Sequence, residues 1–327
     1  DVWNELGYER YEEYSPAFAA EFGYNGPGSW SMLTKAIGNT NLDSKDLALA
    51  LHQKAFYGMQ KIAAGLNREF QNPPTEGPAW YFAAALVQAR AVGIGLKHFR
   101  SLYKSCSGTI LWQFNDMWPA LSWAVLDYTG FRKLAWHALK SAYQPRTINI
   151  GRVDQGAQLN IINDSADPWQ DEFKVTLLDV EGKIVDKNQI IIELSPFNVN
   201  RTRLTEIFPL IANGNFDGFL HVQNNDFSFS RRSTLKPAIT APKPEFQVNS
   251  EITNGVLRIE INALSYLHEL SILPELFGHS VNVDKQLISL LPGQGAIFEV
   301  SGPIKTLHQI EGFLDQAIWS YNRLLNL

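Results

Sequence analysis

The sequence predicts an α/β region followed by an all-β region, and the change falls near residue 147. Residues 1–147 hold seven of the nine tryptophans and long stretches in which apolar residues recur with helical spacing. Residues 148–327 hold short strand-like stretches with turn residues between them. Alternating strands and helices are typical of parallel sheets with crossover helices, whereas short strands at regular spacing are typical of β-sandwiches.

Two helices are predicted in the first region. Residues 46–70 have apolar residues three and four positions apart and no proline, which favours a helix. Residues 78–105 follow the same pattern, with Pro78 in the first turn, where its missing N–H is tolerated. The segment between them, QNPPTEGP, is rich in helix breakers and predicts a loop.

Two strands and a further helix complete this region. The stretch 15–30, SPAFAAEFGYNGPGSW, contains a short apolar strand, and GTILWQFND at 108–116 predicts a buried one. Residues 131–145 predict a helix that ends at Pro145. The order of strand, helical region, strand and helix predicts parallel pairing. Two strands are too few for a closed barrel or a doubly wound sheet, so we expect further strands upstream of Asp1.

The second region predicts two β-sandwiches of roughly 90 residues each. The proline-rich segment 235–246, LKPAITAPKPEF, separates them, so we place the domains at 148–238 and 239–327. The final segment, 307–327, has a helical pattern that a sandwich does not predict.

Composition argues against several classes of protein. The net charge of −5 and the lack of a basic face argue against a nucleic-acid partner. No run of about 18 apolar residues is present, so no membrane span or membrane partner is expected. The histidines are scattered without metal-ligand spacing, and we expect neither a metal nor another cofactor. A single cysteine, Cys106, favours a reducing compartment, and hence a cytoplasmic protein.

Glu21 is the first residue with candidate chemistry. It ends the apolar run Ala17 to Ala20 and precedes a glycine-rich turn. Catalytic groups of parallel α/β barrels lie where strands end, so this position suits a catalytic carboxylate, with glycines that let the backbone approach a substrate. The alternative is a glutamate that starts a loop and faces solvent.

A second cluster follows the second strand, in GTILWQFNDMWPALSW at 108–123. Two tryptophans, Trp112 and Trp118, stand beside Asn115 and Asp116. Aromatic faces beside amide and carboxylate groups suit a sugar, which has apolar C–H faces and hydroxyls. The alternative is that the tryptophans pack in the core, where most tryptophan surface is buried.

These stretches carry a resemblance to a known family. FAAEFGYNGPGSW and GTILWQFNDMWPALSWAVLDYTGFRKLAWHALK resemble the β-mannosidases of glycoside hydrolase family 2, and residues 267–300 are similar to the C-terminal sandwich of that family. The resemblance implies the C-terminal part of a (β/α)8 TIM barrel in residues 1–147, followed by two immunoglobulin-like β-sandwiches. It also implies an exo-acting, retaining enzyme that removes terminal non-reducing β-D-mannose.

The resemblance implies roles for five residues. Glu21 matches the catalytic nucleophile at the end of the seventh barrel strand, and Trp112 matches the tryptophan beneath the terminal mannose. Trp3 matches a tryptophan on the approach to the nucleophile strand and is expected to line the same pocket. Asn115 and Asp116 match the Asn-Asp pair of the last strand and are expected to bind substrate.

A retaining glycosidase needs a second carboxylate, and the resemblance places this acid/base upstream of the chain. Glu5, Glu9, Glu12 and Glu13 belong to a charge-rich segment that we interpret as solvated surface. We therefore expect the upstream part of the same polypeptide as a partner, and an isolated chain without activity. Two alternatives stay open: another family-2 exo-glycosidase, such as a β-galactosidase or β-glucuronidase, and a non-catalytic carbohydrate-binding module.

Overall fold

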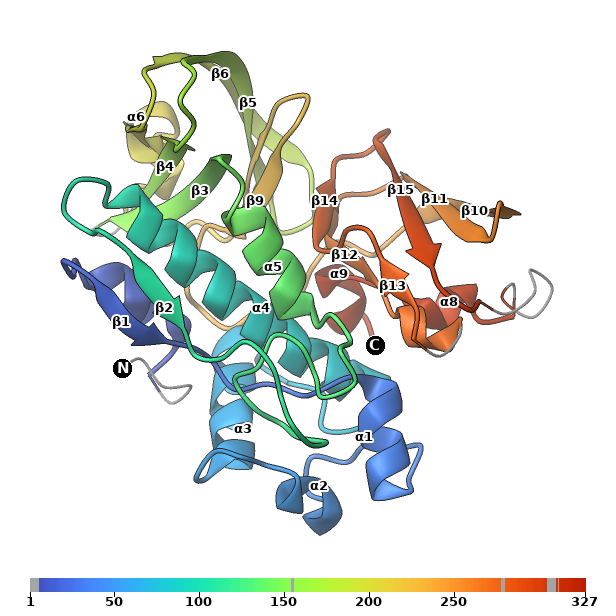
Figure 1. Ribbon diagram of the computed structural model, residues 1–327. Coiled ribbons are helices and arrows are strands. Elements are labelled where there is room, and N and C mark those ends of the chain that lie inside the picture. Colours follow the sequence, from blue (N-terminus) through green and yellow to red (C-terminus); the bar gives the residue numbers. More distant parts are fainter. Residues whose placement is uncertain (1–5, 154–155, 278–279, 305–309, 311) are drawn as a thin grey trace.

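The computed structural model describes residues 6–153, 156–277, 280–304, 310 and 312–327. The described chain contains four antiparallel sheets, several helices and one short parallel pair of strands. In Figure 1 the long helix α4 (Gly77–Ser101) lies at the centre, between the N-terminal strands and the two groups of β-strands. The predicted order of an α/β region before an all-β region is therefore observed.

The first group of elements, here called the helical unit, ends at residue 142. Besides α4 it contains η1 (Tyr8–Glu13), β1 (Ala19–Phe22), α1 (Trp30–Ile37), α2 (Leu47–Leu51), α3 (Gly58–Glu69), β2 (Thr109–Leu111) and α5 (Leu134–Ala142). Strands β1 and β2 pair in parallel, with Ala19 opposite Thr109 and Phe22 opposite Leu111. The predicted parallel pairing is thus observed, although β2 is shorter than the predicted strand at 108–116.

Helix α4 is the core of the helical unit. It begins with Gly77 and Pro78, as predicted from the proline, and it is the one described helix that is long and apolar enough to cross a membrane. That apolar window is 89% buried inside the fold, so α4 is packed as a core helix. Gly93 lets α5 approach closely, because a Cβ at this position would lie 3.2 Å from the Cβ of Ala138.

The predicted helix over 46–70 is wrong in its middle. The chain forms α2 and α3 with an irregular segment between them, and Tyr57, before α3, has a positive φ of 53°. The backbone of this segment pairs with the loop after β2: Lys54 N donates to Leu121 O at 3.0 Å, and Leu121 N donates to His52 O at 2.9 Å. These long-range bonds replace the helical ones.

The first β unit spans β3 to β9 and has two antiparallel sheets. One contains β3 (Arg146–Val153), β4 (Gly156–Asn163) and β7 (Asn198–Arg203); the other contains β6 (Ile184–Leu194), β5 (Trp169–Asp179), β8 (Gly218–Gln223) and β9 (Ser228–Arg232). Two short helices, α6 (Leu204–Ile207) and η2 (Pro209–Ile211), connect β7 to β8. Ile161, Phe173 and Leu220 belong to one buried cluster shared by both sheets, so this unit is a two-layer sandwich.

The second β unit follows the proline-rich segment. Its sheets contain β10 (Phe246–Thr253), β11 (Val256–Ala263), β15 (Gly295–Ser301) and β13 (Asn282–Val283), and β14 (Ile288–Leu290), β12 (Leu267–Ile272) and β16 (Ile318–Trp319). A short helix, η3 (Pro274–Leu276), follows β12. Both sheets share a buried cluster that includes Ile259, Leu270 and Phe298.

The C-terminal segment is not one helix in its described part. It contains α8 (Leu314–Ala317), the strand β16 and α9 (Tyr321–Leu324). Ile318 and Trp319 pair with Ile272 and Ser271 of β12, and this pairing interrupts the helical pattern. The domain boundaries at residues 147 and 238 stay a prediction.

Candidate active site

Glu21 and Trp112 lie at the carboxyl ends of the two parallel strands. Phe22 pairs with Leu111, and Trp112 N donates a hydrogen bond of 2.7 Å to Phe22 O. The sequence neighbours of this pair, Glu21 and Trp112, are therefore held at the same end of the sheet. The peptide bond between Trp112 and Gln113 is cis.

The two faces of this strand pair differ. Phe22 is buried, and its ring packs edge-on against Tyr11 of η1 and Phe99 of α4. Glu21 is exposed, and Trp112 is 47% exposed. Because successive side chains of a strand point to opposite faces, the helix-covered face holds Phe22 and the uncovered face holds the carboxylate.

Gly23 has a steric reason to be glycine. A Cβ at this position would lie 1.8 Å from the carbonyl oxygen of Trp112, so any side chain would force the two strand ends apart. Tyr11 also donates its hydroxyl to Gly23 O at 2.7 Å. Gly23 therefore permits contact between the strand ends, and the expectation that the glycines of this turn serve substrate approach stays a prediction.

Asp116 is a buried residue of the loop that follows β2. Its carboxylate accepts from Lys54 Nζ at 2.5 Å and from Ser122 Oγ at 2.7 Å. Burial lowers the pKa of the nearby Lys133 to about 7, and the negative charges of Asp116 and Asp127 oppose that shift. These contacts fix the loop, so the geometry indicates a positioning contact for Asp116. The substrate contact that the resemblance implies for it stays a prediction.

Asn115 and Trp118 lie nearer to solvent in the same loop. Asn115 is exposed, and its Nδ2 donates to Asp116 O at 3.2 Å. Trp118 is 38% exposed, with the ring of His52 6.0 Å away and the Lys54 ammonium 5.8 Å from its centre. The tryptophans of this loop are therefore partly available to a ligand. Trp3 lies outside the described residues.

The charge-rich N-terminal segment is not simply surface. Tyr11 is buried. The Glu12 carboxylate accepts hydrogen bonds of 2.7 Å from Nη1 and from Nη2 of Arg231, and the Glu12 side chain is only 3% exposed. The prediction of a solvated face is wrong for Glu12, because its partner is far away in the sequence. Burial raises the pKa of Glu9, whereas Glu13 forms an exposed pair with Arg10; Glu5 is outside the described residues.

Two residues that sequence reasoning missed support the site. Lys54 reaches Asp116 from the segment between α2 and α3. Asp127 accepts from the Ser29 hydroxyl and from Thr129 N and Phe131 N, which ties the turn after β1 to the loop after β2. The contacts of Lys54 with Asp116 and of Asp127 with Ser29 could not be identified from a local pattern, because these partners are distant in sequence. Across the described part of the chain, no group of three or more His, Cys, Asp or Glu side chains is arranged to hold a metal ion.

No family model matches the chain, but curated proteins do. The chain is 27% identical over 158 residues to β-mannosidase B of Emericella nidulans, an alignment that covers 46% of this chain and 19% of that protein. It is 23% identical over 215 residues to β-mannosidase A of Aspergillus clavatus, covering 58% of this chain and 23% of that protein. The chain thus spans about a fifth of the length of these relatives.

Solved structures share the fold. The β-D-mannosidase of Dictyoglomus thermophilum superposes with a TM-score of 0.80 at 18% identity, over 98% of this chain and 39% of that one. The exo-chitosanase of Amycolatopsis orientalis superposes with a TM-score of 0.62 at 12% identity, over 92% of this chain and 41% of that one. Together with the sequence relatives, these matches confirm that the chain resembles part of the β-mannosidases of glycoside hydrolase family 2.

Proposed function

We propose that this chain is the nucleophile-bearing portion of an exo-acting, retaining β-mannosidase. The observation that carries the proposal is the placement of Glu21: an exposed carboxylate at the carboxyl end of a parallel strand, beside a half-exposed tryptophan. The β-mannosidases among its relatives support this chemistry.

In the proposed reaction Glu21 attacks the anomeric carbon of the terminal mannose and forms a glycosyl-enzyme. A second carboxylic acid protonates the departing oxygen, and the same group then activates the water that releases mannose with retained configuration. The two carboxyl groups of such a pair lie about 5 Å apart. Trp112 offers an apolar face on which the sugar ring packs, and Asn115 offers amide groups for its hydroxyls.

The second carboxylate and the rest of the sheet come, in this proposal, from the upstream part of the same polypeptide. The face of β1–β2 that carries Glu21 also exposes apolar side chains, with Phe18 48% and Ile110 52% accessible. Parallel sheets are normally covered on both faces, so this face fits the interior of a (β/α)8 barrel whose other strands lie upstream. The two β units would be immunoglobulin-like supports.

A covalent label tests the role of Glu21. The full-length protein is incubated with a 2-fluoro mannoside, which traps the glycosyl-enzyme, and the labelled peptide is sequenced by mass spectrometry. We expect the label on Glu21, its loss in Glu21→Gln, and normal labelling in the control Glu13→Gln, whose carboxylate forms an exposed pair with Arg10. A label on another carboxylate, or near-normal turnover by Glu21→Gln, contradicts the assignment.

Substrate choice separates the alternatives. Aryl β-mannoside, β-galactoside, β-glucuronide and β-glucosaminide are compared by kcat/KM on the full-length protein, the last because of the fold shared with an exo-chitosanase. We expect the mannoside to lead by a wide margin. Turnover led by another glycoside makes the protein a different exo-glycosidase, and binding of mannoside without turnover makes it a carbohydrate-binding module.

A further inference from the structure

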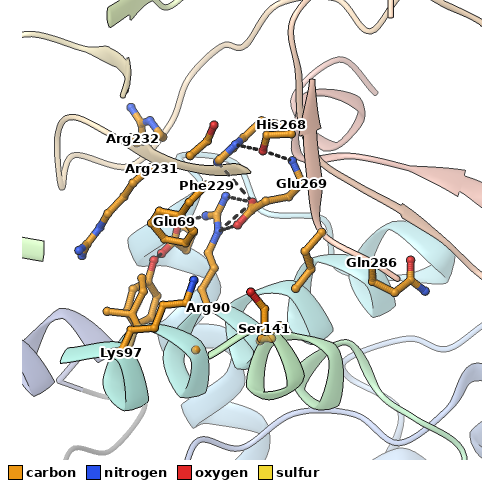
Figure 2. A pocket seen from close by; sticks show the side chains of 18 of the residues that line it. Glu69, Arg90, Lys97, Ser141, Phe229, Arg231, Arg232, His268, Glu269 and Gln286 are labelled. Atoms are coloured by element: carbon orange, nitrogen blue, oxygen red, sulfur yellow. Dashed lines mark hydrogen bonds and ion pairs between the residues drawn. The ribbon is translucent and has the colours of Figure 1, made fainter. Parts of the chain in front are cut away.

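A second cavity lies away from Glu21 and Trp112, where α4 and α5 meet both β units. Its volume is about 490 Å³, and no residue of the candidate active site lines it. Figure 2 shows it between the helices carrying Arg90, Lys97 and Ser141 and the strands carrying Phe229 and Glu269. The exposed residues Lys140, Ser141 and Gln144 also line it, so the cavity reaches the surface.

Several cations around this cavity already have anionic partners. Arg90 binds Glu69 and Glu269, Arg231 binds Glu12, and Lys285 pairs with Asp284. Buried charges are normally paired in this way, because an isolated charge loses its hydration.

Among the lysines that line the cavity, Lys97 is the buried one. It is 5% exposed and lines the cavity, yet among the described residues no carboxylate lies within ion-pair distance of it. Its ammonium lies 4.1 Å from the centre of the Phe229 ring. Burial, with a smaller contribution from the positive charge of Arg100, lowers the pKa of Lys97 to about 7. An anion in the cavity would restore its charge.

His137 of α5 is a second polar group without a partner. It lines the cavity, is 5% exposed, and neither ring nitrogen has a hydrogen-bond partner within the described part of the chain. His137 and Lys97 come from neighbouring parts of α5 and α4. Ala138, the residue after His137, packs against Gly93 of α4, and Lys97 lies one helical turn after Gly93. Burial lowers the pKa of His137 to about 3, so the ring is neutral.

We propose that this cavity binds a small organic monocarboxylate, with Lys97 as its ion-pair partner and Phe229 against its apolar body. A carboxylate matches the buried, unpaired ammonium of Lys97; among the described residues, the other lining lysines without a carboxylate partner, Lys140 and Lys236, are exposed. A phosphate dianion fits less well, because the neighbouring guanidinium groups of Arg90 and Arg231 already hold carboxylates. Ile94 and Ala138 add apolar surface for the body of the ligand.

The test measures the binding of benzoate to the full-length protein by isothermal titration calorimetry at pH 8. We expect saturable binding of benzoate, and no binding of its neutral isostere benzamide or of inorganic phosphate at the same concentrations. Because binding recharges Lys97, the observed heat should differ between two buffers of different ionisation enthalpy, by up to about one proton taken up per site.

Variants test whether the Lys97 ammonium is the group that binds the carboxylate of benzoate. Lys97→Met keeps the apolar stem and should weaken benzoate binding at least about tenfold, since it removes one partner of a buried charge pair. The matched control Lys187→Met, on the exposed face of β6, should bind as the parent does. Equal binding of benzamide, binding of phosphate instead of benzoate, absence of benzoate binding, or unchanged binding in Lys97→Met overturns the proposal. The comparison of benzoate with benzamide needs no variant to fold.

Discussion

Two regions that pack against helix α4 have opposite character. At the β1–β2 sheet, the residues with candidate chemistry are exposed, and one face of the sheet is bare of cover. At the junction with the β units, charged groups are buried and bonded to one another, as around Arg90 in Figure 2. A region that keeps its charges paired and buried has its partners within the chain, whereas the bare sheet is the face that the proposed upstream strands would cover.

The largest expected effect concerns the bare sheet. The 327-residue chain by itself should show no measurable hydrolysis of aryl β-mannoside, because only one carboxylate of the required pair is recognisable in it. Addition of the upstream part of the polypeptide should restore turnover. The assay requires a preparation shown by mass spectrometry to lack upstream fragments. Turnover by such a preparation would mean that the chain carries its own acid/base, and the comparison between the two regions would fail.

The next effect concerns the buried junction. Arg90 is 9% exposed at its side chain, binds Glu69 of α3 and Glu269 of β12, and lies 4.4 Å from the Tyr321 ring of α9. Arg90→Met leaves both carboxylates buried without their cation, so the free energy of unfolding should fall by about 3–5 kcal/mol. Urea unfolding measures it.

A matched control and a rescue sharpen this prediction. Arg258→Met removes an exposed arginine whose carboxylate partners are also exposed, and it should change stability by less than about 1 kcal/mol. Adding Glu269→Gln to Arg90→Met removes one unpaired charge and should recover part of the loss. Equal destabilisation by Arg90→Met and Arg258→Met would show that the buried ion pairs of Arg90 contribute no more to the free energy of unfolding than an exposed pair does.

The two regions also show which features of the fold and of the candidate site could be predicted from the sequence. The spacing of apolar residues predicted α4, and the position of Glu21 at a strand end followed from the apolar run before it. Long-range partners escaped prediction: Glu12 is buried because Arg231 lies 219 positions away, and the break between α2 and α3 exists because its backbone pairs with Leu121. Local sequence carries the period of an element and the residue types of a site, but it carries no record of contacts between distant segments.

A third prediction concerns Glu275 of η3, which joins the second β unit to the helical unit. Its Oε1 accepts from Trp30 N at 3.0 Å and from the Tyr81 hydroxyl at 3.5 Å, while Oε2 has no hydrogen-bond partner among the described residues. Burial raises the pKa of Glu275 to about 7, and the charge of Asp127 adds to the shift. The folded chain therefore binds this proton more tightly than the unfolded chain, whose carboxyl titrates near 4.5.

The stability that this proton contributes is fully present below pH 4.5. It is lost as the pH rises from 4.5 to about 7, by at most about 1.4 kcal/mol per pH unit. Glu275→Gln should flatten this part of the stability profile, measured by urea unfolding across pH 4.5 to 8. Glu193→Gln, which replaces an exposed carboxylate on β6, should leave the profile unchanged. An unchanged slope in Glu275→Gln would show that the carboxyl is not neutral in the fold.

The smallest effect returns to the bare sheet and separates ligand contact from packing. Trp112 is half-exposed beside the strand ends, so its ring contributes less to the core than a buried tryptophan does. If it stacks on the terminal sugar, Trp112→Ala in the full-length protein should weaken binding of a mannose-like inhibitor by about 1–3 kcal/mol, through lost apolar contact, with little change in the melting temperature. Trp136→Ala, which removes a partly buried ring next to His137 on α5, should show the reverse pattern. Calorimetric binding and thermal melting on the same samples measure both quantities. Lower stability with unchanged affinity in Trp112→Ala would assign this tryptophan to packing and leave Glu21 without an aromatic neighbour for the sugar.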